Sequence, residues 1–301
     1  MSSSIKSGFV ALLGAPNVGK STLMNQVLKE KISITCPKPQ TTRNRILGIF
    51  NRPDCQMIFV DTPGIHRARD AFNRILVDTA LATLDEVDAI CFVIEAPEPE
   101  READRFALEA MAAVSTPAIL VINKVDLLKN KAVLLPIIDR YRGLRDFEAV
   151  VPVSALTGDG VPELIDALVR LLPEGPRYYP EDHITDQPER FLAAEIIREK
   201  VFHLTEQEVP YAVAVTVDQF SEDPERRRVH IEATIHVERS SQKGILIGKG
   251  GRMLKEIGRQ ARIDIERLLG CRVFLGLFVR IQKNWRKDTR QMAEFGYRAP
   301  R

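Results

Sequence analysis

The sequence predicts an α/β domain with a doubly wound, mostly parallel sheet, followed by a smaller α+β domain. Three observations support this fold class. A glycine-rich phosphate-binding motif at residues 14–22 lies between a predicted strand at 9–13 and a predicted helix at 23–28. Apolar strands then alternate with helical segments, as in a sheet covered on both faces. After a proline-rich stretch the pattern changes to α-β-β-α, a G-x-x-G loop, and α-β.

Length and composition are those of a globular protein with two domains. The chain has 301 residues, 45% apolar and 28% charged, so each domain is large enough to bury a core. Residues 1–7 are short and polar, so we expect no signal peptide. No apolar stretch approaches the roughly 18 residues that span a bilayer, and we expect any membrane contact to be peripheral. Reduced thiols are favoured over a metal or disulfide role for the well-separated Cys36, Cys55, Cys91 and Cys271.

Charge is distributed unevenly along the chain. Residues 239–301 hold 16 Lys and Arg against 5 Asp and Glu, a net charge of +11, whereas the remainder holds 27 basic and 36 acidic residues, a net charge of −9. A basic C-terminal part indicates a polyanionic partner for the second domain.

The first motif has the pattern G-x-x-x-x-G-K-[ST] of a phosphate loop. In such a loop the backbone N–H groups and the helix N-terminus surround the β-phosphate. Lys20 is expected to reach the β- and γ-phosphate oxygens, and Ser21 to offer its hydroxyl to Mg²⁺. The predicted nucleotide contacts are Gly14, Ala15, Pro16, Asn17, Val18, Gly19, Lys20, Ser21 and Thr22.

A polar loop with two prolines follows at residues 30–42 and is expected to be mobile. A threonine in this loop would complete the Mg²⁺ ligands when a γ-phosphate is present. Thr42 is favoured over Thr41, and the alternative is that both are ordinary loop residues.

The next motif closes a predicted hairpin of strands at 46–50 and 56–60. An aspartate at the end of a strand beside a phosphate loop holds Mg²⁺ through water, and a glycine three residues later lets its N–H approach the γ-phosphate. D-x-x-G alone is common, but its order after the phosphate loop makes it informative. The predicted contacts are Asp61, Thr62, Pro63 and Gly64, with Asp61 as a metal ligand.

The sequence N-K-x-D at 123–126 follows a predicted strand at 118–122 and predicts the base. The Asp126 carboxylate can accept the N1–H and N2–H of guanine together, a pairing that adenine does not offer, so GTP is preferred to ATP. Asn123 is placed to reach the base or to tie neighbouring loops together, and the Lys124 stem to lie over the ring. The predicted base contacts are Asn123, Lys124, Val125 and Asp126 and, after a strand at 150–153, Ser154, Ala155 and Leu156.

These elements in this order resemble the translation-factor-related GTPases. Ile65 occupies the position where Ras-like members carry a glutamine, and an aliphatic side chain cannot orient water by hydrogen bonding. The resemblance implies that Asn17 helps to bind K⁺ in place of an arginine finger. Ile65 is counted among the nucleotide contacts. We expect Mg²⁺ on Ser21, Thr42 and, through water, Asp61, with in-line attack by water and no identifiable general base. The residues expected to serve hydrolysis are Lys20, Asn17, Thr42 and Gly64.

A stretch with four prolines at 173–188 predicts a semi-rigid linker. Beyond it, periodicity predicts the second domain. Its predicted elements are a helix at 191–204, strands at 211–220 and 229–237, a helix at 252–269 and a strand at 272–281.

The G-x-x-G loop of this domain lies between an apolar helical turn and a basic amphipathic helix. Its glycines would let the backbone approach nucleic-acid phosphates, and neighbouring cations would add attraction. The order of elements resembles a type II KH domain, whose loop clamps about four single-stranded nucleotides. The alternative is a glycine turn on a solvated basic face. The predicted RNA contacts are Gly248, Lys249, Gly250, Gly251, Arg252 and Lys255.

Taken together, the chain resembles the Era family of bacterial ribosome-assembly GTPases. The expected organisation is a GTPase domain at 1–172, a linker at 173–188, a KH domain at 189–283 and a basic tail at 284–301. The resemblance implies GTP and GDP as ligands and the 3′ end of small-subunit (16S) ribosomal RNA in the 30S subunit as partner. It also implies a cytoplasmic protein with some peripheral inner-membrane association, and we expect a monomer.

Two functional hypotheses stay open. In the first, the protein is a GTP-hydrolysing switch whose loops at 30–42 and 62–70 set the orientation of the KH domain. In the second, it is a constitutive RNA-binding assembly factor that uses GTP mainly as a structural ligand, and Ile65 keeps this reading open because intrinsic turnover would be slow. Trp285 and Tyr297 either stack on RNA bases or pack at the edge of the domain.

Overall fold

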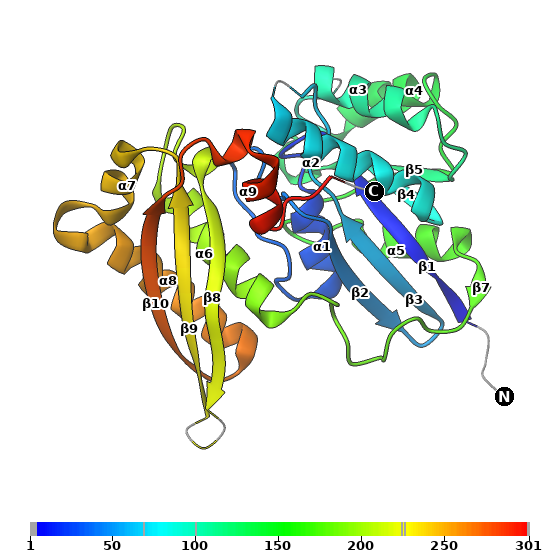
Figure 1. The fold of residues 1–301 in the computed structure, drawn as a ribbon. Helices are drawn as coiled ribbons and strands as arrows, with labels where there is room; N and C mark the ends of the chain where they lie inside the picture. The colour runs from blue at the N-terminus through cyan, green and yellow to red at the C-terminus, as the bar shows by residue number, and fades with distance from the viewer. Residues whose placement is uncertain (1–4, 69, 100, 224, 226, 300–301) are drawn as a thin grey trace. The chain divides into compact units, whose positions relative to one another are not determined.

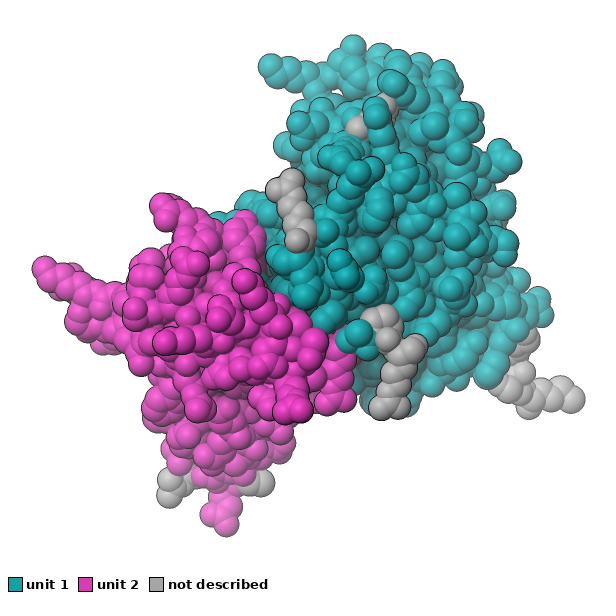
Figure 2. Space-filling view, turned by 45° about the horizontal axis from the view of Figure 1, so that its top comes forward, with its two compact units in different colours: residues 1–186, 299–301 teal, residues 187–298 magenta. Residues whose placement is uncertain are grey.

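The protein consists of two compact units, each with its own sheet (Figures 1 and 2). The first is Met1–Asp186 with Ala299–Arg301, and the second is Gln187–Arg298. The structure, a computed structural model, describes residues 5–68, 70–99, 101–223, 225 and 227–299.

A mostly parallel sheet forms the centre of the first unit, as the sequence predicts. Its main strands run in the order β2-β3-β1-β4-β5-β6, with β2 antiparallel to β3 and the other pairs parallel. The order reverses beside β1, and ligands of such sheets bind at the carboxyl ends of the strands near this reversal. The strands are β1 (Ile5–Leu13), β2 (Ile46–Arg52), β3 (Cys55–Asp61), β4 (Ala89–Glu95), β5 (Ala118–Asn123) and β6 (Ala149–Pro152).

Helices cover both faces of this sheet, which makes it doubly wound (Figure 1). On one face α1 contacts β2 and β3, and α5 contacts β5 and β6. On the other face Ala80, Met111 and Ile137, from α2, α3 and α4, pack against β4 and β5. Both of these strands are buried at every position, as expected of parallel strands covered on two sides. The helices are α1 (Lys20–Leu28), α2 (Ala71–Ala82), α3 (Glu102–Met111), α4 (Leu134–Arg142) and α5 (Val161–Leu171).

Most of the predicted linker belongs to the first unit. The short strand β7 (Glu174–Gly175) pairs antiparallel with the start of β1, and the Ile49 N–H donates to the Ile184 carbonyl at 2.9 Å. The Gln56 carboxamide oxygen accepts hydrogen bonds from the Tyr178 and Tyr179 N–H groups. The prolines indicated extended backbone, but they could not show that this backbone runs along the sheet. The prediction of a linker starting at 173 was therefore wrong, because the unit extends to Asp186.

The second unit is a three-stranded sheet with helices on one face, in the α-β-β-α-α-β order that the sequence predicts. The sheet order is β10-β9-β8, with β8 antiparallel and β10 parallel to β9. Strand β8 begins later than expected because Pro210–Ala212 forms a 3₁₀ turn. The elements are α6 (Glu189–Leu204), β8 (Ala214–Asp223), β9 (Arg228–Val237), α7 (Ser240–Ile247), α8 (Arg252–Leu269) and β10 (Arg272–Ile281). Within the described residues, no helix is long and apolar enough to cross a membrane.

The segment predicted as a basic tail is packed structure. Trp285, in a 3₁₀ turn, is fully buried and donates its indole N–H to the Ala212 carbonyl at 2.9 Å. After α9 (Thr289–Glu294), Tyr297 stacks on Trp285 with ring centroids 5.7 Å apart. Of the two roles left open for these aromatic residues, packing is correct and stacking on RNA is wrong. The expectation of a tail at 284–301 is therefore wrong for residues 284–298, which belong to the second unit. Residues 300 and 301 lie outside the described part of the chain.

Candidate functional site

The phosphate loop joins the end of β1 to α1, where the backbone leaves little room for side chains. Gly14 has φ 150°, and a Cβ there would lie 2.2 Å from the Val93 carbonyl oxygen. Gly19 has φ 98°, and a Cβ there would lie 2.3 Å from the Asn123 side-chain nitrogen. Both glycines are therefore required by close packing, and the loop leads directly into the N-terminus of α1, where a phosphate is favoured.

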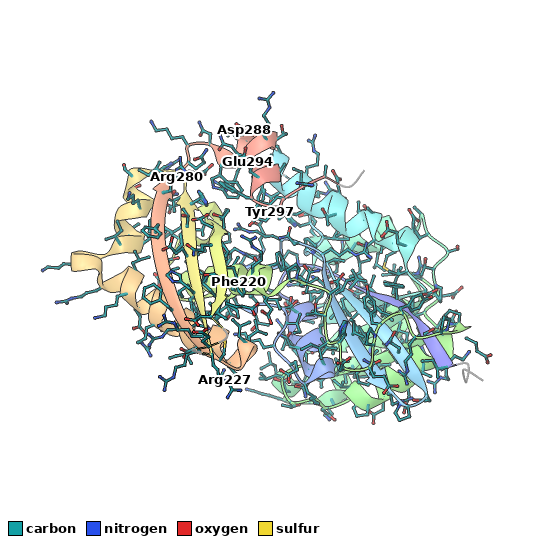
Figure 3. All side chains as sticks on the ribbon, turned by 60° about the horizontal axis from the view of Figure 1, so that its bottom comes forward. Phe220, Arg227, Arg280, Asp288, Glu294 and Tyr297 are labelled. Atoms are coloured by element: carbon teal, nitrogen blue, oxygen red, sulfur yellow. The ribbon has the colours of Figure 1, made fainter. Side chains whose placement is uncertain are left out.

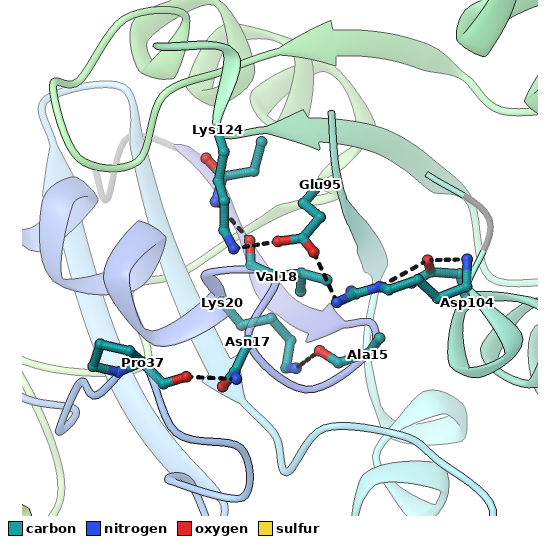
Figure 4. Close-up of polar contacts among 10 residues, drawn as sticks. Ala15, Asn17, Val18, Lys20, Pro37, Glu95, Asp104 and Lys124 are labelled. Carbon is teal, nitrogen blue, oxygen red and sulfur yellow. Dashed lines mark hydrogen bonds and ion pairs between the residues drawn. The ribbon is translucent and has the colours of Figure 1, made fainter. Parts of the chain in front are cut away.

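Lys20 is held across this loop. Its ammonium donates to the Ala15 carbonyl at 2.9 Å (Figure 4) and to the Gly14 carbonyl at 3.0 Å. Only 6% of the residue is exposed. Burial lowers the pKa of Lys20 to about 8. A buried cation with few anionic neighbours is suited to a phosphate ligand, which would restore the charged state.

The three predicted Mg²⁺ ligands lie together. The Ser21 hydroxyl lies 2.8 Å from the Thr42 hydroxyl and donates to Asp61 Oδ2 at 2.6 Å. Thr42 also donates to Asp61 Oδ2 at 3.3 Å, whereas Thr41 donates to the Lys38 carbonyl. The structure therefore brings Thr42, and not Thr41, to the other two residues.

These oxygens fit a divalent cation. Asp61 is fully buried, which raises its carboxyl pKa, and its Oδ1 atom has no hydrogen-bond partner among the described residues. No cluster of three or more His, Cys, Asp or Glu side chains suited to a metal occurs in the described part of the chain. A site with one carboxylate and two hydroxyls is typical of Mg²⁺, which keeps several of its waters and binds substrate phosphates.

Sequence reasoning missed the residues that anchor the loop at 30–42. The Ser33 hydroxyl donates to Asp61 Oδ2 at 3.0 Å. The Asn25 side chain, on α1, accepts hydrogen bonds from the Ile32 and Ser33 N–H groups, both at 3.0 Å, and donates to the Ser33 carbonyl. Asp61 Oδ2 thus accepts hydrogen bonds from hydroxyl groups at both ends of this loop and from the hydroxyl of Ser21. No motif in the sequence marks Asn25 or Ser33.

The D-x-x-G segment approaches the phosphate loop through its backbone. A Cβ on Gly64 would lie 2.7 Å from Pro16 Cα, and the Ile65 N–H donates to the Gly14 carbonyl at 3.0 Å. The Ile65 side chain is fully buried in the core beside α2, α3 and α4, so only its backbone lies at the loop. Thr62 is also buried, and its hydroxyl donates to the Leu12 carbonyl.

The N-K-x-D segment links three loops. Asn123 donates to the Val18 carbonyl at 2.7 Å and accepts from the Ala155 N–H at 2.9 Å, so it ties the phosphate loop to the loop after β6. Of the two roles expected for Asn123, the structure shows the tie. Asp126 and Leu156 are exposed, while Val125, Ser154 and Ala155 are buried. Asp126 makes no side-chain hydrogen bond with any residue that the structure describes, so its carboxylate is available to a base.

Glu95, at the end of β4, is a further residue of this site that sequence reasoning missed. It forms ion pairs with Lys124 and, at 2.9 Å, with Arg101 (Figure 4). Arg101 is held in turn by Asp104, a fully buried residue at the start of α3. Glu95 therefore restrains the lysine that is expected to lie over the guanine ring.

In the second unit the G-x-x-G loop is open to solvent. Gly250 and Gly251 have φ values of 62° and 79°, and a Cβ on either would contact nothing within 4 Å, so the conformation, not crowding, requires glycine. Lys249, Arg252 and Lys255 are exposed around the loop. The six predicted RNA contacts therefore lie together, on the loop and the first turn of α8.

A groove runs from this loop between α8 and β10. Its lining combines an apolar floor with basic side chains on one helix face, spaced four and three residues apart. The sequence predicted only the part of the groove up to Lys255. The helical spacing of Arg259 and Arg262 after Lys255 could have predicted the rest of its basic side. The lining residues are Gly251, Leu254, Lys255, Gly258, Arg259, Arg262, Leu275 and Leu277.

Comparisons with known proteins agree with this description. A family model described as "50S ribosome-binding GTPase" matches residues 9–124, and a KH domain model matches residues 208–286. The chain is 53% identical to GTPase Era of Syntrophus aciditrophicus (strain SB) over 292 residues, which are 97% of this chain and 95% of that protein. It is 54% identical to GTPase Era of Geotalea uraniireducens (strain Rf4), over 97% of this chain and 98% of that protein.

Solved structures agree over both units. An Era point variant from Aquifex aeolicus bound to GDP·AlF4⁻ has a TM-score of 0.95 at 41% identity, covering 98% of this chain and all of that one. Era in complex with MgGDPNP and nucleotides 1506–1542 of 16S ribosomal RNA has a TM-score of 0.95 at 42% identity, covering 98% of this chain and 99% of that one. With a phosphate-loop unit and a KH unit matched in order over nearly its whole length, this chain belongs to the Era family of GTPases.

Proposed function

We propose that this GTPase is a switch that binds the single-stranded 3′ end of 16S ribosomal RNA and assists maturation of the 30S subunit. The observation that carries the proposal is the position of Asp61, whose Oδ2 atom accepts hydrogen bonds from the phosphate loop and from both ends of the loop at 30–42. A ligand that changes these hydrogen bonds would also move that loop. The related Era complex with MgGDPNP and 16S RNA supports the choice of both ligands.

In the proposed reaction the residues of this chain bind and orient GTP and neutralise the charge on its phosphates. Lys20 and the loop N–H groups bind the β- and γ-phosphates, and Asp126 selects guanine. Ser21, Thr42 and Asp61 would hold Mg²⁺, which when bound neutralises charge on the phosphate oxygens. Water then attacks the γ-phosphorus in line with the β–γ bridging oxygen, the bond between these two atoms breaks, and GDP and inorganic phosphate leave, with the proton of the water passing to phosphate or solvent. Because the Ile65 side chain lies in the core, it does not orient this water, and we expect slow intrinsic turnover.

We also propose that Asn17 contributes to a K⁺ site. It lies in the phosphate loop at φ 66°, and its side-chain nitrogen donates to the Pro37 carbonyl at 2.7 Å. Its side-chain oxygen accepts no hydrogen bond from a described residue, so it remains available to a monovalent cation. Replacing K⁺ by Na⁺ at constant ionic strength should slow single-turnover hydrolysis, and Asn17→Ala should remove the difference. Equal rates in the two salts would contradict the K⁺ proposal.

Coupling between the two ligands is tested by RNA binding. The full chain is titrated onto a labelled oligonucleotide matching the 3′ end of 16S RNA, with GDP and with a non-hydrolysable GTP analogue. We expect at least about fivefold tighter binding with the analogue, a coupling free energy near 1 kcal/mol. Lys249→Glu should weaken binding in both states, whereas the matched control Lys283→Glu changes the same charge away from the loop.

Two results would redirect the proposal. Equal RNA affinity with GDP and the analogue would favour the second candidate, a constitutive RNA-binding factor, which the buried Ile65 keeps open. Absence of RNA binding in both states would refute the RNA-binding function itself. The cytoplasmic location, the peripheral inner-membrane association and the monomeric state are proposed from the family resemblance, and cell fractionation and sedimentation equilibrium would test them.

A further inference from the structure

The face of the second sheet opposite α6, α7 and α8 is covered at His236 by Phe295, with ring centroids 4.3 Å apart, and carries exposed aromatic side chains along β10. The residues of β9 and β10 alternate between the two faces, and Ile231, Ala233 and Val273 belong to the core formed with α6, α7 and α8. On the opposite face of β10, Phe274 and Phe278 are 57% and 55% exposed. Exposed phenylalanines grouped on a regular strand are unusual for a surface without a ligand.

These two residues form a strip along the edge of the sheet, in which the Phe274 ring lies against His230 with centroids 4.7 Å apart. Strand β10 is an edge strand, since its pairing partner is β9 alone. Gly276 lies between the two phenylalanines on the same face, and a Cβ there would lie 3.9 Å from the Phe278 ring. With about 3.3 Å per residue, the two phenylalanine positions are roughly 13 Å apart. Gly276 itself places no side chain between them, and the Glu232 side chain of β9 lies beside it, with Cγ 3.7 Å from the position of a Gly276 Cβ.

Cations lie at both ends of the strip. Arg272 and Arg280 are exposed on the same face of β10 (Arg280 is labelled in Figure 3), and neither forms a salt bridge with a residue that the structure describes. Two acidic residues lie on the same face. Asp218 accepts hydrogen bonds from Thr216 and Thr234, and Glu232 lies 3.4 Å from His230, a contact that becomes an ion pair when the imidazole is protonated.

The strip is continuous with the groove of the KH domain. Leu275 and Leu277 line that groove, while Phe274 and Phe278 are on the other face of the same edge strand. A single strand of RNA leaving the groove therefore has to cross only the width of β10 to reach the strip.

We infer that the strip (Phe274, Gly276 and Phe278, flanked by Arg272 and Arg280) is a second subsite for single-stranded RNA. The two phenylalanine rings stack on bases beyond the roughly four that a KH groove holds, and the arginines contact their phosphates. Aromatic side chains on an open sheet face recognise single-stranded RNA in other folds by the same physical means. The inference rests on the proposed RNA-binding function and extends the site by these residues.

The test compares two oligonucleotides on the full chain with a GTP analogue. A short one fills the groove alone, and a long one extends beyond it by about six nucleotides. Wild-type protein should bind the long RNA at least about tenfold more tightly. The double change F274A/F278A should remove at least about fivefold of this gain and leave the short RNA within twofold. Ile263→Ala, an exposed apolar side chain on α8 outside the groove lining, is the matched control and should change neither.

Two conservative substitutions keep the test valid if the F274A/F278A variant is unstable. Phe274→Tyr and Phe278→Tyr preserve stacking rings and should retain the preference for the long RNA. The inference is overturned if F274A/F278A folds and keeps that preference, which would leave the strip to a protein partner. It is also overturned if the preference is lost equally in the Ile263→Ala control. If neither RNA binds to the wild-type chain, the proposed function fails as well, so the two failures are distinguishable.

Discussion

Asn123→Ala should loosen the nucleotide site more than any exposed asparagine change. The Asn123 side chain is 1% exposed and joins Val18 to Ala155 by hydrogen bonds of 2.7 and 2.9 Å. Its removal leaves a buried carbonyl and a buried N–H without partners, each costing about 1–3 kcal/mol. Allowing for partial relaxation, we expect a loss of about 2–4 kcal/mol in the free energy of unfolding.

Thermal unfolding of the full chain and equilibrium nucleotide binding measure this loss. The melting temperature of the first unit should fall by roughly 4–16 °C. Because Asn123 holds the phosphate loop against the loop after β6, the affinity for GDP and GTP should fall roughly 10- to 100-fold. Asn130→Ala is the matched control, since its exposed side chain accepts one hydrogen bond, from the Ala132 N–H, and should cost about 1 kcal/mol or less.

A comparable effect of the two alanine changes would refute this reasoning. It would show that water replaces the lost partners and that the loops keep their positions without Asn123. Asn123→Asp refines the test, because it keeps an acceptor for the Ala155 N–H but places a carboxylate oxygen against the Val18 carbonyl. We expect it to be at least as destabilising as alanine at neutral pH.

Three further predictions follow from buried groups. Trp285→Ala should cost the second unit about 3–5 kcal/mol in thermal or denaturant unfolding, with Trp285→Phe costing less, and a change under 1 kcal/mol would contradict the burial. Ile65→Gln should not speed single-turnover hydrolysis and should destabilise the first unit by about 2 kcal/mol or more, because it buries an amide in the core; faster hydrolysis would show that the side chain reaches the site. Burial lowers the pKa of Lys20 to about 8, and bound phosphates should raise it. Nucleotide binding should therefore take up protons near pH 8 and weaken as the pH rises beyond it, as titration calorimetry in buffers of different ionisation enthalpy would show; equal observed heats in these buffers would exclude this linkage.

Sequence patterns were enough to predict both folds and most of the nucleotide site. The phosphate loop, Asp61 and Asn123 each follow a predicted strand, and parallel strands bring their carboxyl ends to one edge of the sheet. A motif of consecutive residues at such a position therefore predicts the ligand that it binds from the sequence alone. The G-x-x-G loop was found for the same reason, because its glycines and cations are neighbours in the chain.

Contacts between segments that are distant in the chain could be found only from the folded structure. Ser33, in a loop, contacts Asp61, and Glu95, at the end of β4, contacts Lys124, although neither Ser33 nor Glu95 belongs to a motif. The prolines after residue 172 predicted a linker. The segment instead pairs with β1 and belongs to the first unit up to Asp186. Local pattern gives the conformation of a segment and the chemistry of its side chains. Which surface covers a side chain, as for the buried Trp285 and the exposed Phe278, depends on the packing of elements that lie far apart in the chain.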